Sequence, residues 1–364
     1  MNIFVTGGAG YIGSATSEAL LKAGHNVTVY DSLVTGHRQA VPDGANFIQA
    51  DISDSHSLAV ALTGQKYDAV LHFAAFIEAG ESMRDPGKFL RNNLVNSLSL
   101  IDMAARVNIK RFVLSSTAAV YQSSEAPLTE ESPLGPTNTY GYTKLAVEQS
   151  LDWYRQIHGL HFAALRYFNA SGALPGRGEA HQPESHLIPR VLQVALGQAE
   201  AALIFGTDYP TPDGTCIRDY VHLGDLVSAH ILALEALAER DKLVYNLGSG
   251  TGYSVREVID TARVVSGKTI PVKELERRPG DSARLVASSE KIRRELGWHG
   301  QSSVTSARGI LASWRRYSPK MLPSISPIFS SKTQPYFGGW FFCWYRTMRI
   351  LASLTSFIIS VFVL

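Results

Sequence analysis

The chain has 364 residues, of which 45% are hydrophobic and 18% are charged, and its formal net charge is +2. This composition is typical of a globular protein with a large core, and without a basic block it argues against nucleic acid as a partner. The two cysteines, Cys216 and Cys343, form no C-x-x-C pattern, so neither a disulfide framework nor a structural zinc site is predicted. No basic and apolar leader precedes the first predicted strand, so we expect no signal peptide and a cytoplasmic location.

The first 23 residues have the pattern of a strand, a glycine-rich turn and a helix. The apolar run 2–5 is followed by a segment in which Gly7, Gly10 and Gly13 keep a three-residue spacing. This spacing suits a tight turn whose backbone can approach a pyrophosphate and whose helix packs close to its strand. We therefore predict cofactor contacts at Gly7, Gly10, Tyr11, Ile12 and Gly13. The alternative is a turn with a structural role only.

The next predicted strand, 27–30, ends in Asp31. A carboxylate at this position can accept hydrogen bonds from an adenosine ribose, and it would repel a 2′-phosphate. Asp31 therefore favours NAD over NADP as the cofactor. The alternative is an aspartate that only begins a loop.

Strands and helices keep alternating after Asp31. Apolar runs at 47–50, 69–72 and 111–114 predict buried strands, and helical patterns cover 55–63 and 86–107. Repeated units of this kind predict an α/β fold with a doubly wound parallel sheet, a Rossmann-type NAD domain, whose ligand crevice lies at the carboxyl ends of its strands. Further cofactor contacts are predicted there, at Asp51, Ile52, Phe73, Ala74, Ala75 and Ser115. For Asp51, a helix cap is an equally good interpretation.

Tyr140 and Lys144 lie four residues apart, so on a helix the ammonium can approach the phenol. A nearby cation favours phenolate, which would lower the pKa of the tyrosine from about 10 toward the range of a general base. Thr117, after the strand at 111–114, can hydrogen-bond a substrate hydroxyl. These three predicted catalytic residues suit removal of a proton from an alcohol while hydride leaves its carbon. The alternatives are a packed tyrosine with a solvated lysine, and turn chemistry at Thr117.

Several further segments complete a resemblance to a known family. The segments that carry it are 6–13, 72–75, 115–121, 140–144, 165–169, 205–211, 213–220 and 277–281. On these the chain resembles the extended short-chain dehydrogenase/reductases, and most closely the 4-epimerases of UDP-sugars, from its first strand to about Tyr317. The resemblance implies an isomerase that carries out NAD-dependent epimerisation at carbon 4 of a UDP-hexose, between UDP-glucose and UDP-galactose, through a transient 4-keto sugar. It also implies a homodimer.

The resemblance also assigns a substrate site and a domain division. The substrate contacts that it implies are Thr117, Tyr140, Asn169, Leu187, Arg218, Tyr220, Arg278 and Asp281. Guanidinium groups match phosphate oxygens, although a lone surface arginine more often belongs to a structural ion pair. We expect an NAD-binding domain from 1–170 and 217–250, and a smaller α/β domain that binds UDP-sugar from 171–216 and 251–318.

Two departures from the family pattern leave alternatives open. Segment 76–82 has no lysine where many relatives place one, so retention of NAD could be weaker here. Leu285 is intermediate in bulk at a wall that varies in the family, so acceptance of N-acetylated or pentose UDP-sugars is open. Ala118 and Ala119 after Thr117 supply no acid for a dehydratase. A net oxidoreductase, a decarboxylase and a non-catalytic nucleotide sensor remain alternatives.

Two parts of the chain lie outside this scheme. His181 and His186 have no neighbouring metal-ligand pattern in the sequence, so we interpret them as loop residues and expect no metal. The atypical apolar tail, 319–364, includes an uncharged run at 350–364 that is short against the roughly 20 residues needed to span a bilayer. It is interpreted as an altered reading frame, as a helix buried in an oligomer or against the body, or, least favoured, as a membrane attachment.

Overall fold

The computed structural model describes residues 1–181 and 184–300. Seven parallel strands form its main sheet in the order β10-β6-β5-β4-β1-β2-β3. Their bounds are β1 Asn2–Thr6, β2 Asn26–Asp31, β3 Asn46–Gln49, β4 Ala69–His72, β5 Arg111–Thr117, β6 His161–Tyr167 and β10 Lys242–Leu247. The strand order reverses between β1 and β4, and in such sheets ligands bind outside the strand ends at this point. The predicted doubly wound fold is confirmed.

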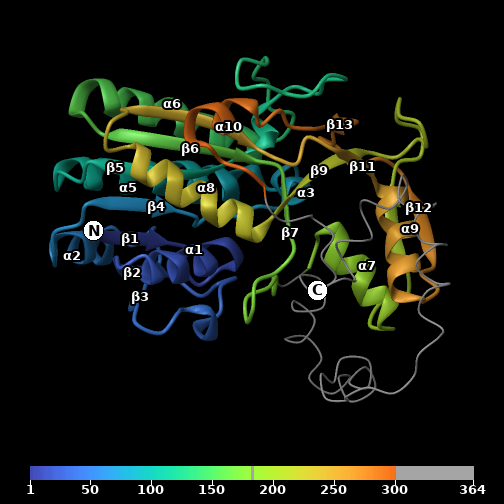
Figure 1. Ribbon diagram of the computed structural model, residues 1–364, viewed down its shortest axis with the longest axis horizontal. Coiled ribbons are helices and arrows are strands. Elements are labelled where there is room, and N and C mark those ends of the chain that lie inside the picture. The colour runs from blue at the N-terminus through green and yellow to red at the C-terminus, as the bar shows by residue number, and fades with distance from the viewer. Residues whose placement is uncertain (182–183, 301–364) are drawn as a thin grey trace, which may run out of the picture.

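Helices cover both faces of this sheet, so its strands are apolar on both sides. On one face Leu20 of α1 and Leu226 and Ala233 of α8 join the core, and Figure 1 shows α1 and α8 crossing in front of the strands. On the other face the core includes Leu58 of α2 and Leu151 of α6, together with residues of α5. These helices are α1 Tyr11–Lys22, α2 Ser55–Thr63, α5 Asn96–Arg106, α6 Thr139–His158, α8 Leu223–Ala236 and, near β10, α10 Glu290–Leu296.

A smaller group of elements lies beyond the strand ends of the main sheet (Figure 1). A four-stranded sheet contains β7 Asn169–Ser171, β9 Ile217–His222, β11 Gly252–Ser254 and β13 Arg284–Leu285. A second, two-stranded sheet pairs β8 Ala202–Phe205 with β12 Val272–Leu275. Helices α7 Leu187–Ala195 and α9 Val255–Ser266 pack on these strands around Val191, Ile204 and Ile259. This group faces the crevice of the main sheet.

The helix predicted over 86–107 forms in three parts. The parts are α4 Pro86–Phe89, a π-helical turn η2 Leu90–Val95, and α5. Asn93, in the π-helical turn, accepts a hydrogen bond from Phe76 N (2.9 Å) and donates one to Phe76 O (2.8 Å). The turn therefore holds the segment that leaves β4, which continues into the short helix α3 Ala79–Ser82.

Two single helical turns, η1 Arg38–Ala40 and η3 Ala118–Val120, complete the elements. Within the residues that the structure describes, none of the helices has the length and hydrophobicity that crossing a bilayer requires. The predicted tail, 319–364, lies outside the described residues.

Candidate active site

A cavity of about 1560 Å³ lies between the main sheet and the smaller group of elements. All the predicted cofactor residues line it: Gly7, Gly10, Tyr11, Ile12, Gly13, Asp31, Asp51, Ile52, Phe73, Ala74, Ala75, Ser115, Tyr140 and Lys144. All the predicted substrate residues line it too: Thr117, Tyr140, Asn169, Leu187, Arg218, Tyr220, Arg278 and Asp281. A pocket for one drug-sized ligand measures roughly 300–1000 Å³, so this cavity has room for two ligands side by side.

The glycine turn between β1 and α1 has the shape that a dinucleotide needs. Gly7 has a φ of +72°, and a Cβ there would lie 2.5 Å from Ala74 N. A Cβ on Gly13 would lie 2.3 Å from Gly7 O, so only glycine lets the helix start this close to the strand. Gly10, at the start of α1, gives the helix no side-chain cap. The first-turn amides are thus available to a phosphate, and the residues present fit NAD.

Asp31 and Asp51 follow neighbouring strands, as expected, but each is also used inside the protein. Asp31 accepts hydrogen bonds from Ala9 N (2.9 Å) and Leu33 N (2.8 Å), and burial raises the pKa of its carboxyl. A carboxylate has about four acceptor positions, so two are left for ribose hydroxyls. Asp51 accepts from Ser53 N at 2.8 Å, which is turn chemistry, while Asp54 is the residue that caps α2. The helix-cap interpretation of Asp51 is therefore wrong, and its cofactor contact stays a prediction.

Tyr140 lies in the first turn of α6, directly against Thr117. Asn138 caps this helix by accepting from Gly141 N at 2.8 Å. A Cβ on Gly141 would lie 2.2 Å from Ala119 O, so the glycine lets the helix end sit on the turn that follows β5. Thr117 accepts from Ala119 N (3.1 Å) and is hydrogen-bonded to the Tyr140 phenol. The predicted hydroxyl and phenol are thus in contact.

The predicted effect of Lys144 on Tyr140 is wrong. The pKa of Tyr140 is raised to about 12, mainly by burial. The hydrogen bond with Thr117 lowers this pKa, and the negative charge of Glu78 raises it. Burial also lowers the pKa of Lys144 to about 8, opposed by the charge of Glu148. Both side chains line the cavity, but burial is the largest influence on each pKa, and the Lys144 charge is not among the influences on Tyr140.

Sequence reasoning missed the buried polar groups behind Lys144. Glu148 pairs with Arg166 at 2.6 Å, with both side chains 6% exposed, and it also accepts a hydrogen bond from Ser116. His72 contacts Thr6 Oγ1 (2.7 Å), and burial, followed by the nearby Lys144 charge, lowers its pKa to about 3. Glu148 lies four residues after Lys144 and could have been found by the same helical spacing.

The far wall of the cavity carries the predicted phosphate-binding residues. Arg218 lies 3.4 Å from Asp281, so the two form an ion pair. The Arg278 guanidinium stacks on the ring of Phe205 at 3.6 Å from its centroid. Asn169 uses one amide hydrogen on Asp219 O at 2.9 Å, which leaves its second hydrogen for a ligand. The two guanidinium groups bring positive charge to the side of the cavity opposite the glycine turn.

The loop between β7 and α7 contributes charged residues that sequence reasoning did not connect. His181 Nε2 lies 2.5 Å from Glu78 Oε1, and this contact joins the loop to the segment after β4. Burial would raise the pKa of Glu78, but the hydrogen bond from His181 and those from backbone amides outweigh it and lower the pKa to about 2. The same loop places Glu179 and Glu184 beside His186. Neither arrangement follows a regular sequence spacing.

The fold and the cavity define a class of protein, namely enzymes that handle an alcohol beside a bound dinucleotide in a Rossmann-type sheet. Residues 3–248 match the NAD dependent epimerase/dehydratase family, and the chain belongs to this family. The predicted family and its NAD cofactor are thereby confirmed. The chain is 48% identical over 302 residues to a UDP-glucose 4-epimerase of Lacticaseibacillus casei, covering 82% of this chain and 91% of the relative.

Solved structures agree with this comparison. A UDP-glucose 4-epimerase from Brucella ovis in complex with NAD has a TM-score of 0.78 and 42% identity, covering 82% of this chain and 93% of that one. A UDP-glucose 4-epimerase from Bifidobacterium longum in complex with NAD⁺ and UDP has a TM-score of 0.82 and 35% identity, covering 88% and 99%. The latter protein binds a dinucleotide and a uridine nucleotide together.

Proposed function

We propose that this protein is an isomerase that epimerises carbon 4 of a UDP-hexose, interconverting UDP-glucose and UDP-galactose with NAD. The observation that carries this proposal is the single cavity that joins the glycine turn, Tyr140 with Thr117, and the guanidinium groups of Arg218 and Arg278. A cofactor cradle, a proton-transfer group and a diphosphate wall are the three parts that such a reaction requires. The names of the relatives support the substrate class.

The proton-transfer part is built from three residues. Tyr140 removes the proton of the sugar 4-hydroxyl and later returns it, and Thr117 positions that hydroxyl by its contact with the phenol. Lys144, buried beside them, holds the nicotinamide ribose, while the turn at Gly7 to Gly13 holds the pyrophosphate and Asp31 the adenosine ribose. Bound NAD supplies the acceptor and then the donor of the carbon-4 hydride, together with a positive charge that favours the phenolate.

The far wall explains how both faces of the sugar can be used. Arg218, Arg278 and Asn169 hold the diphosphate, and Asp281 holds a ribose hydroxyl. Binding energy placed on the nucleotide leaves the hexose free to turn as a 4-keto sugar and to receive its hydrogens on the other face. This requires an open cavity around the sugar, which the volume of about 1560 Å³ provides.

The test is to mix pure protein with UDP-galactose and no added cofactor. Formation of UDP-glucose supports the epimerase, accumulation of reduced nicotinamide would indicate a net oxidoreductase, and no change would indicate a nucleotide sensor. Tyr140→Phe should lower kcat by roughly 100- to 10,000-fold while UDP binding, measured by calorimetry, is retained. Tyr154→Phe, at a tyrosine of the same helix that does not line the cavity, is the matched control. Normal turnover of Tyr140→Phe would contradict the mechanism.

We also propose a homodimer. Tyr142, Trp153 and Ile157 of α6 are 52%, 64% and 67% exposed and lie at helical spacing along one face. Val95, just before α5, is 53% exposed as well, and α5 packs beside α6. Exposed apolar side chains on neighbouring helices are typical of a protein–protein interface. Sedimentation equilibrium tests the assembly, and a monomer at micromolar concentration would contradict it.

The location and the domain division are proposals too. We propose a cytoplasmic protein, in keeping with the unpaired Cys216.

We keep the division into an NAD-binding domain (1–170, 217–250) and a UDP-sugar-binding domain (171–216, 251–318). Strand β9 pairs within the smaller sheet while the following helix α8 packs on the main sheet, so the segment that begins at the proposed boundary, residue 217, contacts both.

A further inference from the structure

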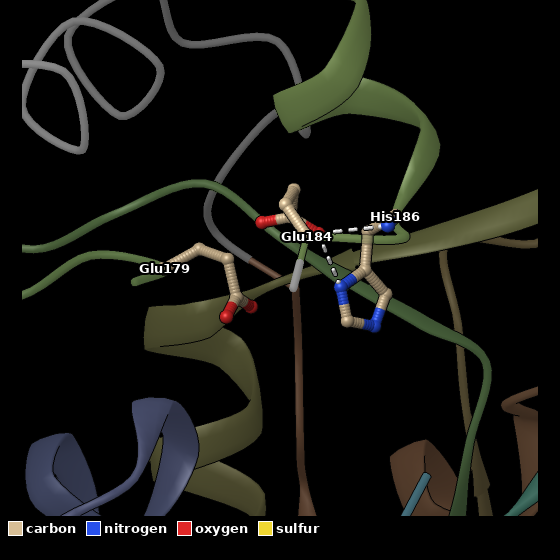
Figure 2. Close-up of side chains that lie close together, drawn as sticks. All are labelled: Glu179, Glu184 and His186. Carbon is tan, nitrogen blue, oxygen red and sulfur yellow. Dashed lines mark hydrogen bonds and ion pairs between the residues drawn. The ribbon is translucent and has the colours of Figure 1, made fainter. Parts of the chain in front are cut away.

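Three potential metal ligands converge in the loop that precedes α7. Glu179, Glu184 and His186 each offer a ligand atom, and these atoms all lie within 4.8 Å of one another. Figure 2 shows the Glu179 carboxylate and the His186 ring on opposite sides of Glu184. All three residues line the cavity, as does Tyr11 of the glycine turn. The convergence is independent of the residues assigned to proton transfer.

Glu184 supplies a separate observation that points to a ligand. Its side chain is only 4% exposed. Oε1 accepts a hydrogen bond from His186 N at 2.7 Å and contacts His186 Nδ1 at 2.9 Å. Among the residues that the structure describes, Oε2 is buried and has no hydrogen-bond partner. A buried carboxylate oxygen without a partner is costly, so Oε2 is an acceptor that a bound cation can use.

An ion pair between Glu184 and His186 does not explain these features. The pair accounts for Oε1, but it leaves Oε2 without a partner and places the second carboxylate, Glu179, in the same small space. Two like charges this close repel each other, and a cation that contacts both carboxylates would relieve that repulsion. In Figure 2 the free oxygen of Glu184 is on the side of the carboxylate turned away from His186.

We propose that Glu179, Glu184 and His186 bind one divalent transition-metal cation. Two carboxylate oxygens and one imidazole nitrogen are a donor set that suits Zn²⁺ or Mn²⁺, whereas Mg²⁺ prefers oxygen ligands alone. Ligand bonds of about 2 Å place opposite donors about 4 Å apart, so small side-chain shifts close the site. Three protein ligands leave a coordination position for water. The cation neutralises the two carboxylates on this wall of the cavity. This proposal differs from the prediction made from the sequence, which was that the loop binds no metal.

The test uses the full-length protein after dialysis against a chelator. Calorimetric titration with ZnCl₂ should show one site per chain that binds Zn²⁺ and Mn²⁺ more tightly than Mg²⁺. Glu184→Gln and His186→Gln each remove one ligand and should weaken Zn²⁺ binding by at least about tenfold. The matched control is the double variant Glu200→Gln with His299→Gln, which removes the same group types from exposed positions outside the cluster.

A thermal unfolding series separates loss of the site from loss of the fold. In chelator the variants should unfold at the temperature of the wild type or above it, and only the wild type and the control should gain stability on addition of ZnCl₂. Wild-type protein that binds no Zn²⁺ at one per chain overturns the proposal, whatever the variants do. Equal binding by wild type, Glu184→Gln and His186→Gln overturns it as well, because the metal would then lie elsewhere.

Discussion

The contact between α6 and the turn after β5 gives the sharpest test of how the active site is assembled. Gly141→Ala adds one methyl group next to Tyr140. That Cβ would lie 2.2 Å from Ala119 O and 2.8 Å from Ala119 C, whereas ordinary contacts begin at 3.4 Å. The obstacle is backbone, so it cannot rotate away. The first turn of α6 and the turn at Ala119 must therefore move apart.

The size of the effect follows from that overlap. Restoring an ordinary contact requires a shift of about 1 Å, and a misplacement of that size at a catalytic group costs about 100-fold in rate. Because Thr117 stays on β5 while Tyr140 moves with α6, their hydrogen bond lengthens. Overpacking of this kind also costs about 1–3 kcal/mol of the unfolding free energy. We expect kcat to fall about 100-fold while KM for UDP-galactose changes little, since Arg218 and Arg278 are untouched.

The assay compares kcat, KM and urea unfolding for Gly141→Ala and a matched control. Gly87→Ala is the control. It also adds a methyl group in a helix, but the atoms nearest to that Cβ belong to the end of the Arg91 side chain, the first at 3.1 Å, and not to backbone. The control should keep its rate and stability. Wild-type kcat in a stable Gly141→Ala protein would refute the idea that close approach of α6 positions Tyr140.

Two further predictions concern the buried groups behind the site. Glu148→Gln removes the charged partner of Arg166, so the unfolding free energy in urea should fall by about 3–5 kcal/mol. The control Glu290→Gln, at an exposed pair, should leave the unfolding free energy almost unchanged. Equal losses for the two variants would argue against a buried ion pair. Lys144 has a pKa of about 8 in the folded protein and a higher value when unfolded, so above pH 8 the unfolded chain binds more protons and stability rises with pH. The unfolding free energy of the wild type minus that of Lys144→Met should therefore grow by about 2 kcal/mol between pH 8 and pH 10, and a constant difference would contradict the lowered pKa.

Short local spacings were enough to predict the positions of several site residues from the sequence. Three glycines at a fixed spacing after an apolar strand predict the turn between β1 and α1, because strand, turn and helix are consecutive in the chain. The four-residue spacing of Tyr140 and Lys144 likewise needs only one helix. The position of Asp31 follows from the end of a strand. These groups line one cavity because the carboxyl ends of parallel strands meet at the same edge of a sheet.

Properties that depend on tertiary packing could not be predicted in this way. The pKa of Tyr140 is set mainly by burial, and burial depends on how the smaller group of elements closes over the sheet. The pair between Arg218 and Asp281 joins residues 63 positions apart. Glu179, Glu184 and His186 converge through an irregular loop with no period to read. Local sequence patterns thus predict where the site lies, while the electrostatics within it depends on long-range contacts.

The π-helical turn Leu90–Val95 has a consequence for how this lineage can vary. A π turn is an α-helical turn with one extra residue. That residue sets how α4, before the turn, is rotated about the helix axis relative to α5, after it. Removing a single residue there would restore regular winding and swing the Asn93 amide away from Phe76, releasing the strip of chain that runs from β4 along the cavity. We expect substitutions on the outer surface of this helix to be tolerated far more readily than any change in its length.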